Sequence, residues 1–356
     1  MSQALLTELC LKELVLCGVH EGETVVIVSQ GVERLDYADA FMAAAARLGA
    51  FSHHLRLATA TNDLDADGGA WTVGVTPLAG NEAAVEALKL ADLVIDLIFL
   101  LFSPEQLAVE ASGTRILLAV EPVDVLARLF PTRDLRERVE VGGELLGSAQ
   151  ALRVTNTAGT DVTYKLGAYP TITEYGYTDT PGRWDHWPSG FLFTGAHDDG
   201  VDGRVVIAPG DIVYPFKDYV SSPVELTIEQ GRIVDLRGPG LDAALLRDYM
   251  ASFEDTDAYG IAHIGWGLNE KARWSSLATD RRGIGAEGRS FYGNVLFSTG
   301  PNQELGGSNA SPCHIDIPMR GCSLYLDDEP ILVDGDVVHT DMKVDRVATA
   351  LNGSSR

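Results

Sequence analysis

The sequence has few cysteines and few basic residues for its length. Its 356 residues include four cysteines and no C-x-x-C pair, which is too sparse for a disulfide scaffold. We therefore expect reduced thiols and a cytoplasmic protein. Lys and Arg total 27 against 51 Asp and Glu, a net charge of −24. This acidity disfavours nucleic acid and anionic membrane surfaces as partners.

Long apolar runs and nucleotide-binding motifs are also missing. The most apolar stretch, LADLVIDLIFLLF (90–102), holds two aspartates and is shorter than the ~20 residues of a membrane helix. No basic, apolar segment of the secretion-signal type opens the sequence. No G-x-G-x-x-G follows the first expected strand and no Walker-type phosphate loop occurs, which argues against a dinucleotide cofactor.

The first 150 residues alternate strand and helix patterns. The chain is longer than one hydrophobic core usually serves, so two domains are expected. Strands are predicted at 23–30, 51–60, 92–101 and 114–121, and helices at 37–50, 81–91, 103–113 and 132–150. This order predicts a Rossmann-like parallel α/β domain over 1–150, with helices on both faces of the sheet.

From residue 151 the pattern changes to short strands and turns. RVTNTAGTDVTYKLG (153–167) and VELTIEQGRIVDLRG (224–238) are typical of hairpins, and 241–253 is the one clear helix. The prediction is an α+β catalytic, metal-binding domain over 151–345, followed by a tail at 346–356.

Histidine and aspartate in this second domain suggest a metal site. SPCHIDIPMRGCSLYLDD (311–328) reads as a β-hairpin in which His314 and Asp316 project to one side. His263 is the best third ligand, because flanking glycines permit close approach and Trp266 could wall the site. Two imidazoles and one carboxylate suit Fe(II) with positions open for an organic substrate and dioxygen. The same ligands also suit zinc hydrolase chemistry, and a His-Asp pair also occurs as a simple polar contact.

A set of ordered motifs resembles one known family. From roughly residue 90 to 340 the chain is similar to the 2,5-dihydroxypyridine 5,6-dioxygenases of bacterial nicotinate and hydroxypyridine breakdown, which resemble thermophilic aminopeptidases in fold. The motifs are LLFSPEQ, GTRILLAVEP, TEYGYTDTPGRWDHWPSGFLFT, DIVYPFKDY, LRDYM, YGIAHIGWGLN, FYGNVLFSTGPN and PCHIDIP.

The resemblance implies Fe(II) as cofactor, bound by His263, His314 and Asp316. The implied reaction is an extradiol-type cleavage that inserts both atoms of dioxygen across C5 and C6 of 2,5-dihydroxypyridine and gives N-formylmaleamate. A homo-oligomer is implied as well. The residues implied to line the substrate pocket are Glu174, His186, Ser298 and Thr299.

The sequence departs from the family at Phe102, where a histidine is credited with removing the proton of the 5-hydroxyl group. The enzyme is then impaired, or His186 or Glu174 supplies the base, or a related hydroxypyridine is the substrate. Phe102 can also be read as an ordinary core residue. Two rival classes remain: a metallo-aminopeptidase, which needs a carboxylate-rich two-metal site, and a noncatalytic metal-dependent binding protein.

Overall fold

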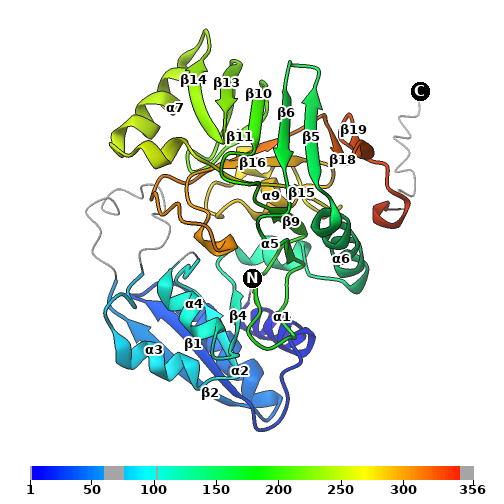
Figure 1. The fold of residues 1–356 in the computed structure, drawn as a ribbon. Helices are drawn as coiled ribbons and strands as arrows, with labels where there is room; N and C mark the ends of the chain where they lie inside the picture. The colour runs from blue at the N-terminus through cyan, green and yellow to red at the C-terminus, as the bar shows by residue number, and fades with distance from the viewer. Residues whose placement is uncertain (1, 60–75, 102, 345–356) are drawn as a thin grey trace, which may run out of the picture.

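The computed structural model describes residues 2–59, 76–101 and 103–344, and it divides into a lower and an upper region in Figure 1. The lower region is built on a five-stranded parallel sheet in the order β2-β1-β3-β4-β8. Its strands are β1 (Thr24–Gln30), β2 (Phe51–Leu57), β3 (Leu93–Asp96), β4 (Arg115–Leu118) and β8 (Trp184–His186). Its helices are α1 (Gln3–Leu16), α2 (Leu35–Arg47), α3 (Glu82–Lys89) and α4 (Pro104–Glu110).

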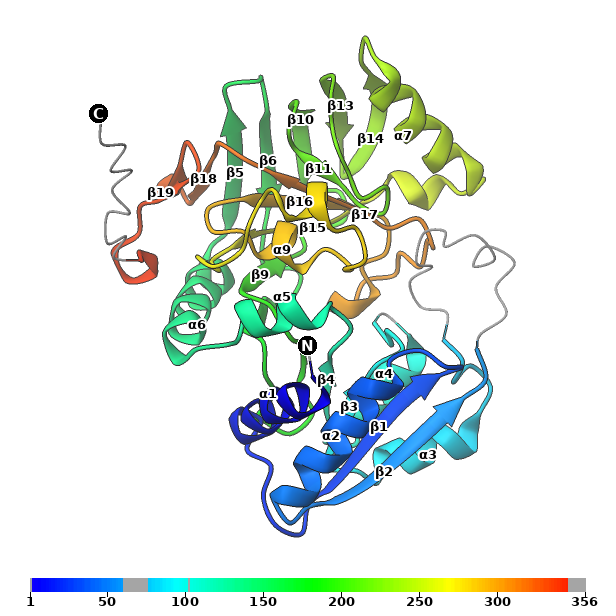
Figure 2. The ribbon, with the colours of Figure 1, turned by 180° about the vertical axis from the view of Figure 1, so that it is seen from behind.

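Alternate residues of β1 enter two different cores. Val25 and Ile27 belong to the core that includes α1 and α2, which lie side by side in Figure 2. Val26 and Val28 belong to the core that includes α3 and α4. A parallel strand covered on both faces carries a continuous apolar run, which is why this strand was recognisable from the sequence.

Local signals place most of these helices. The Ser103 hydroxyl accepts a hydrogen bond from the backbone N–H of Gln106 at 3.1 Å, and Pro104 opens α4, as the capping pattern predicts. Asn81 caps α3 in the same way. Helix α1 was not expected, because its buried stripe includes Glu13, and a charged residue there obscures the apolar period.

The upper region contains two antiparallel sheets. One has eight strands in the order β14-β13-β10-β6-β5-β18-β19-β20, and the other has five in the order β17-β16-β15-β9-β7. The strands of the first are β5 (Ala151–Asn156), β6 (Asp161–Lys165), β10 (Val201–Ile207), β13 (Val224–Glu229), β14 (Arg232–Arg237), β18 (Cys322–Leu326), β19 (Glu329–Val333) and β20 (Asp336–Val337). Those of the second are β7 (Ile172–Glu174), β9 (Phe191–Thr194), β15 (Ile261–Gly267), β16 (Val295–Thr299) and β17 (Ile315–Met319).

Short elements complete the upper region. A two-stranded ribbon, β11 with β12, lies beside β17. Helix α7 packs on β13 and β14, and α6 packs on β7 and β9. The bounds are β11 (Ile212–Val213), β12 (Asp218–Tyr219), α5 (Val123–Arg128), α6 (Arg133–Ser148), α7 (Leu241–Ser252), α8 (Ser276–Thr279), α9 (Ala286–Ser290), and the 3-10 turns η2 (Thr256–Tyr259), η3 (Gln303–Leu305) and η4 (Thr340–Met342).

The predicted hairpins β5–β6 and β13–β14 are present, but the hairpin expected within 311–328 is wrong. Strand β17 pairs with β16, whereas β18 pairs with β5 and β19 in the other sheet. Gly321, with a φ of +63°, lies between them where the chain changes sheets. Strand spacing alone does not reveal which sheet each strand joins.

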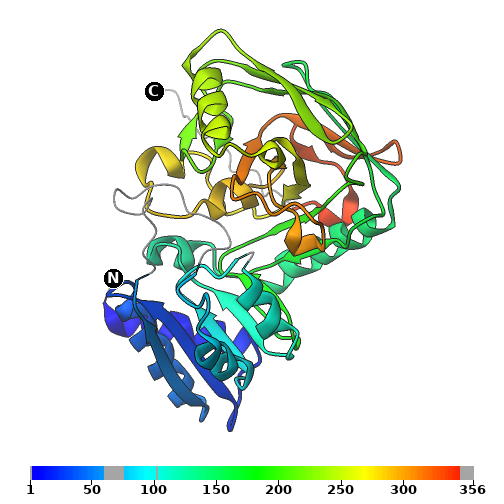
Figure 3. The ribbon, with the colours of Figure 1, turned by 60° about the vertical axis from the view of Figure 1, so that its left-hand side comes forward.

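The two regions are joined by more than one crossing of the chain. Strand β8 comes from the segment assigned by sequence to the second domain, yet it pairs in parallel with β4 of the lower sheet (Figure 3). The boundaries 1–150 and 151–345 therefore stay predictions, and the expected tail at 346–356 lies outside the described residues. Across the part of the chain that the structure covers, no helix has the length and apolar character needed to cross a membrane.

Candidate active site

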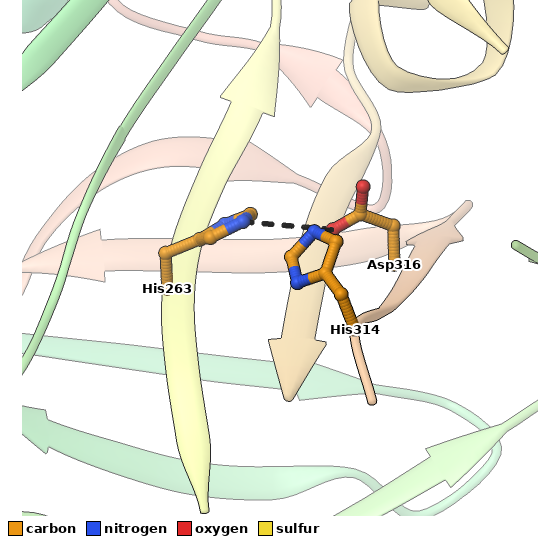
Figure 4. A group of neighbouring side chains, drawn as sticks. All are labelled: His263, His314 and Asp316. Atoms are coloured by element: carbon orange, nitrogen blue, oxygen red, sulfur yellow. Dashed lines mark ion pairs between the residues drawn. The ribbon is translucent and has the colours of Figure 1, made fainter. Parts of the chain in front are cut away.

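Three residues from the region of two strands of the five-stranded antiparallel sheet, β15 and β17, lie close together. His263 lies on β15, and His314 and Asp316 lie just before and within β17. Nε2 of His263 is 3.6 Å from Oδ1 of Asp316, and Nε2 of His314 is 3.3 Å from the same oxygen (Figure 4). One ligand atom from each residue lies within 4.8 Å of the others. The structure thus brings together the three residues that the sequence analysis grouped.

The local backbone explains how β15 supplies its histidine. The pairing of β15 with β16 shifts register between Ile261 and Ile264, so His263 lies in an irregular part of the strand. Such a bulge re-aims a side chain next to a site. The glycines near it serve packing instead, since a Cβ on Gly265 would lie 2.0 Å from the carbonyl oxygen of Leu192. Trp266 packs in the main core and is not among the residues that line the cavity.

The two oxygens of Asp316 have different surroundings. Oδ2 accepts a hydrogen bond from Nε of Arg289 at 2.6 Å. Oδ1 is buried, faces the two imidazoles and has no hydrogen-bond partner. Burial alone would raise the pKa of Asp316, but the charges of His314 and Arg289 outweigh it and hold the pKa well below its usual range. The carboxylate is therefore ionised.

The donor set fits a divalent metal ion. Burial lowers the pKa of His263 to about 3, so its imidazole is neutral, which is the form that binds a metal. Burial also acts to lower the pKa of His314, but the carboxylate of Asp316 dominates and raises it. A cation between the three residues would give Oδ1 the partner that it otherwise lacks.

A cavity of about 430 Å³ opens beside these residues and is lined from both regions. Phe99, Leu101 and Leu118 come from the lower region, and Phe191 and Phe193 from β9. Its polar lining residues include Glu174, His186, Tyr214, Lys217, Arg289 and Glu304. A largely apolar pocket with a few convergent polar groups is typical of a small-molecule site.

Glu174 and His186, both predicted as pocket residues, line this cavity. Glu174 ends β7, and its Oε2 accepts a hydrogen bond from the Ser189 hydroxyl at 2.9 Å. Burial and the nearby Asp185 raise the pKa of Glu174 to about 8. His186 ends β8; burial and Arg289 lower its pKa to about 3, and its Nε2 is buried without a hydrogen-bond partner.

Ser298 and Thr299, the other predicted pocket residues, are buried on β16 and are not among the cavity-lining residues. Ser298 lies opposite Asp316 in the β16–β17 register. Their hydroxyl oxygens have no hydrogen-bond partner. The structure thus places Ser298 beside a candidate metal ligand, with the cavity wall formed by other residues.

Phe102, where the resemblance implies a catalytic histidine, lies outside the described residues. Its neighbour Leu101 and the nearby Phe99 line the cavity. The loop that carries both follows β3, and the buried carboxylate of Asp96 accepts hydrogen bonds from the backbone N–H groups of Ile98 and Leu100 at 2.8 and 2.7 Å. The C-terminal edge of the parallel sheet therefore contributes to the cavity, as open α/β sheets generally do.

Arg289 and Glu304 are among the charged cavity residues that the sequence analysis did not name. Arg289 lies on the five-residue helix α9 and contacts Asp316, but nothing in the surrounding GAEGRS marks it as functional. Glu304 lies in η3, with both carboxylate oxygens buried and without a hydrogen-bond partner, and burial raises its pKa to about 7. The sequence contains only an indirect indication of Glu304, because this residue belongs to a long Gly-rich connection of the kind that often carries functional residues.

The fold and the site together define a mixed α/β enzyme with a candidate centre for one metal ion. Comparison with known proteins refines this class. A family model described as 2,5-dihydroxypyridine 5,6-dioxygenase matches residues 5–339. The chain is also 47% identical over 342 residues to the curated 2,5-dihydroxypyridine 5,6-dioxygenase of Pseudomonas putida KT2440, covering 95% of this chain and 97% of that one. The chain therefore belongs to the 2,5-dihydroxypyridine 5,6-dioxygenase family, and the resemblance seen in its motifs is confirmed.

Solved structures support the same assignment. The structure of 2,5-dihydroxypyridine dioxygenase from P. putida KT2440 matches with a TM-score of 0.93 and 46% identity, over 96% of this chain and 100% of that one. Wild-type AmpT from Thermus thermophilus matches with a TM-score of 0.58 and 14% identity, over 94% and 99%. The second likeness concerns the fold alone, and with the first it confirms the predicted α/β, aminopeptidase-like architecture.

Proposed function

We propose that this protein is an Fe(II)-dependent dioxygenase that cleaves 2,5-dihydroxypyridine between C5 and C6 and releases N-formylmaleamate. The reaction adds both oxygen atoms of dioxygen to the substrate, one at each carbon of the broken bond. Its place is the breakdown of nicotinate and other hydroxypyridines in the cytoplasm. The observation that carries the proposal is the meeting of His263, His314 and Asp316 beside a cavity, in a chain with this family's sequence.

The ligand set favours iron. Two imidazole nitrogens and one carboxylate oxygen would hold a metal ion from one side, and the cavity opens beside these three residues. When bound there, Fe(II) would supply open coordination positions and a path by which electron density from the ring reaches dioxygen. Arg289 holds Oδ2 of Asp316, which leaves Oδ1 as the oxygen available to the metal.

The cavity residues can bind and orient a small polar ring. Because the pKa of Glu174 is about 8, its carboxyl group is mostly protonated at neutral pH and can donate a hydrogen bond to a substrate oxygen. His186 is neutral and has one free nitrogen, Nε2, to donate to or accept from the ring substituents. Phe191 and Phe193 stack on each other with ring centroids 5.2 Å apart and supply an apolar wall that limits the access of water.

One of these residues would also accept the proton of the 5-hydroxyl group, since Phe102 offers no base. Loss of that proton makes the adjacent ring carbon electron-rich and reactive toward dioxygen. Glu174 is the better acceptor above pH 8, where it is ionised, whereas His186 binds a proton only weakly. We propose Glu174 for this role.

The metallo-aminopeptidase alternative lacks a second metal site. Within 2–59, 76–101 and 103–344, the single group of three or more clustered His, Cys, Asp or Glu ligands is His263, His314 and Asp316. A two-metal peptidase needs additional bridging carboxylates at this point.

We also propose that the protein is a homo-oligomer. Light scattering across micromolar concentrations tests this, and a monomer mass would refute it.

The test is an oxygen-electrode screen of protein loaded anaerobically with Fe(II). Dioxygen uptake with 2,5-dihydroxypyridine, and less or none with other hydroxypyridines, is the expected result. Protein loaded with Zn(II) is the matched control and should consume no dioxygen, because zinc is redox-inert. Release of amino acids from peptides, with no uptake on any hydroxypyridine, would favour the aminopeptidase. Binding of iron and ligand without uptake would favour a noncatalytic binding protein.

A further inference from the structure

The position of Arg289 decides which oxygen of Asp316 faces the imidazoles. With Oδ2 held by Nε of Arg289 at 2.6 Å, only Oδ1 points at the candidate metal position. Arg289 is fixed on its other side, where Nη1 donates to the carbonyl oxygen of Ile284 at 2.5 Å and the guanidinium lies 4.5 Å from the ring centroid of Tyr214. Partners of this kind commonly tune the affinity of a metal ligand.

Arg289 is carried by α9, a helix of five residues that is too short to be stable alone. Its first turn is held by a carboxylate from the lower region: Oε1 of Glu121 accepts hydrogen bonds from the backbone N–H groups of Gly285 and Ala286 at 3.0 and 2.8 Å. The fit is tight, since a Cβ on Gly283 would lie 2.1 Å from Oε2 of Glu121.

Glu121 is itself firmly placed. It lies three residues beyond the end of β4, it is 2% exposed, and its carbonyl oxygen accepts a hydrogen bond from the Tyr37 hydroxyl at 2.8 Å. A second contact from the same part of the chain holds the middle of α9, where Arg128 pairs with both oxygens of Glu287, one of them at 2.8 Å. The segment 121–128, which follows β4, therefore holds α9 at two points.

We infer that Glu121 is a positioning residue for the metal centre, acting through α9 and Arg289 on Asp316. Without its carboxylate, two backbone N–H groups lose their acceptor, α9 loses its anchor, and Arg289 no longer fixes Oδ2 of Asp316. The inference rests on the proposed metal centre and adds to it a residue from the parallel-sheet region, outside the cavity lining.

The test measures metal binding directly. Glu121→Ala should raise the dissociation constant for Fe(II), measured anaerobically by chelator competition, about tenfold, the lower end of the range for partners of metal ligands. The visible absorption of bound Co(II), which reports the number and arrangement of its ligands, should change as well. Glu121→Gln keeps an acceptor oxygen and should restore both readouts to near the wild-type values.

Two further variants make the result decisive. Asp327 also accepts backbone N–H groups of two consecutive residues, Gln150 and Ala151, but does not line the cavity, so Asp327→Ala controls for a purely structural loss and should leave metal binding unchanged. Gly283→Ala pushes a methyl group against the carboxylate of Glu121 and should weaken binding as Glu121→Ala does.

Wild-type Fe(II) affinity and a wild-type Co(II) spectrum in Glu121→Ala would overturn the inference. If Glu121→Ala does not fold, the same two results in Gly283→Ala would overturn it. His263→Ala separates this outcome from failure of the proposed function. A wild-type protein that binds iron no better than His263→Ala would remove the metal centre and the inference together, whereas iron binding that depends on His263 but not on Glu121 removes the inference alone.

Discussion

The Ser189 hydroxyl donates a hydrogen bond at 2.9 Å to Oε2 of Glu174, a residue that lines the same cavity as the metal-ligand candidates. This bond favours the ionised carboxylate, while burial and Asp185 favour the protonated form more strongly and set the pKa of Glu174 at about 8. Glu174 is thus a group whose charge changes close to working pH.

If ionised Glu174 accepts the substrate proton, kcat/KM should rise with pH and level off above about 8. In Glu174→Gln this rise of kcat/KM with pH, the rising limb of the profile, should disappear. The rate should fall about 10²-fold to 10⁴-fold. Ser189→Ala removes a hydrogen bond that stabilises the carboxylate, so the limb should move to higher pH. A pH profile of Glu174→Gln that keeps the wild-type limb would assign the proton transfer to another group.

Replacing any one of His263, His314 and Asp316 by Ala should abolish iron binding and activity and leave the fold intact. The reason is that a site of three ligands does not hold the ion with two. Metal analysis and circular dichroism of each variant measure both properties, and His197→Ala, a histidine outside the cavity lining, is the matched control. Full iron occupancy in His314→Ala would remove that residue from the ligand set.

Phe102→His should raise turnover of 2,5-dihydroxypyridine at least tenfold, with little change in stability, because it supplies the basic imidazole that the family resemblance implies at this position. Steady-state kinetics and thermal unfolding give the two quantities. Phe99→His places an imidazole at a nearby cavity residue and should bring no such gain. An unchanged or lower rate in well-folded Phe102→His would show that this position is not the missing base.

Glu13 is fully buried on α1, and neither of its carboxylate oxygens has a hydrogen-bond partner. Burial, with a contribution from Asp185, raises its pKa well above the ordinary 4.5. A raised folded-state pKa gives stability that is fully present below 4.5 and is lost as pH rises through the folded value. Urea unfolding should therefore show Glu13→Met more stable than wild type at pH 8 by about 1–3 kcal/mol.

The gain from Glu13→Met should shrink at pH 5, where the wild-type carboxyl group is more fully protonated. The matched control is Glu8→Met on the same helix, where the carboxylate is exposed and pairs with Arg47; this change should have little effect on the pH dependence. A Glu13→Met protein that is less stable than wild type at pH 8 would contradict a buried, neutral carboxyl group at this position.

Strong local patterns were readable from the sequence, and distant pairing was not. The run around Val25 to Val28 and the cap at Ser103 predicted β1 and α4, because burial on both faces and a capping hydroxyl leave direct signatures. The three residues of β8 carry no period of their own, so their place beside β4 could not be foreseen. The same holds for the separation of β17 from β18.

The site residues likewise include some that the sequence indicated and some that it did not. His263, His314 and Asp316 could be grouped because imidazoles are scarce in this chain and H-x-D has a strand period. Arg289 could not, because its place depends on α9, and α9 is held by Glu121 and Arg128 from more than 150 residues earlier in the chain. Contacts of that separation have no sequence pattern.

The measurement that tests the central claim most directly is the fate of labelled dioxygen. Protein loaded with Fe(II) is given 2,5-dihydroxypyridine under ¹⁸O₂, and the product is analysed by mass spectrometry. We predict N-formylmaleamate with two ¹⁸O atoms, one in the new formyl group and one in the new carboxylate, and no product from His263→Ala. A product with one labelled atom or none, or an intact ring after dioxygen uptake, would contradict the assignment of ring-cleaving dioxygenase.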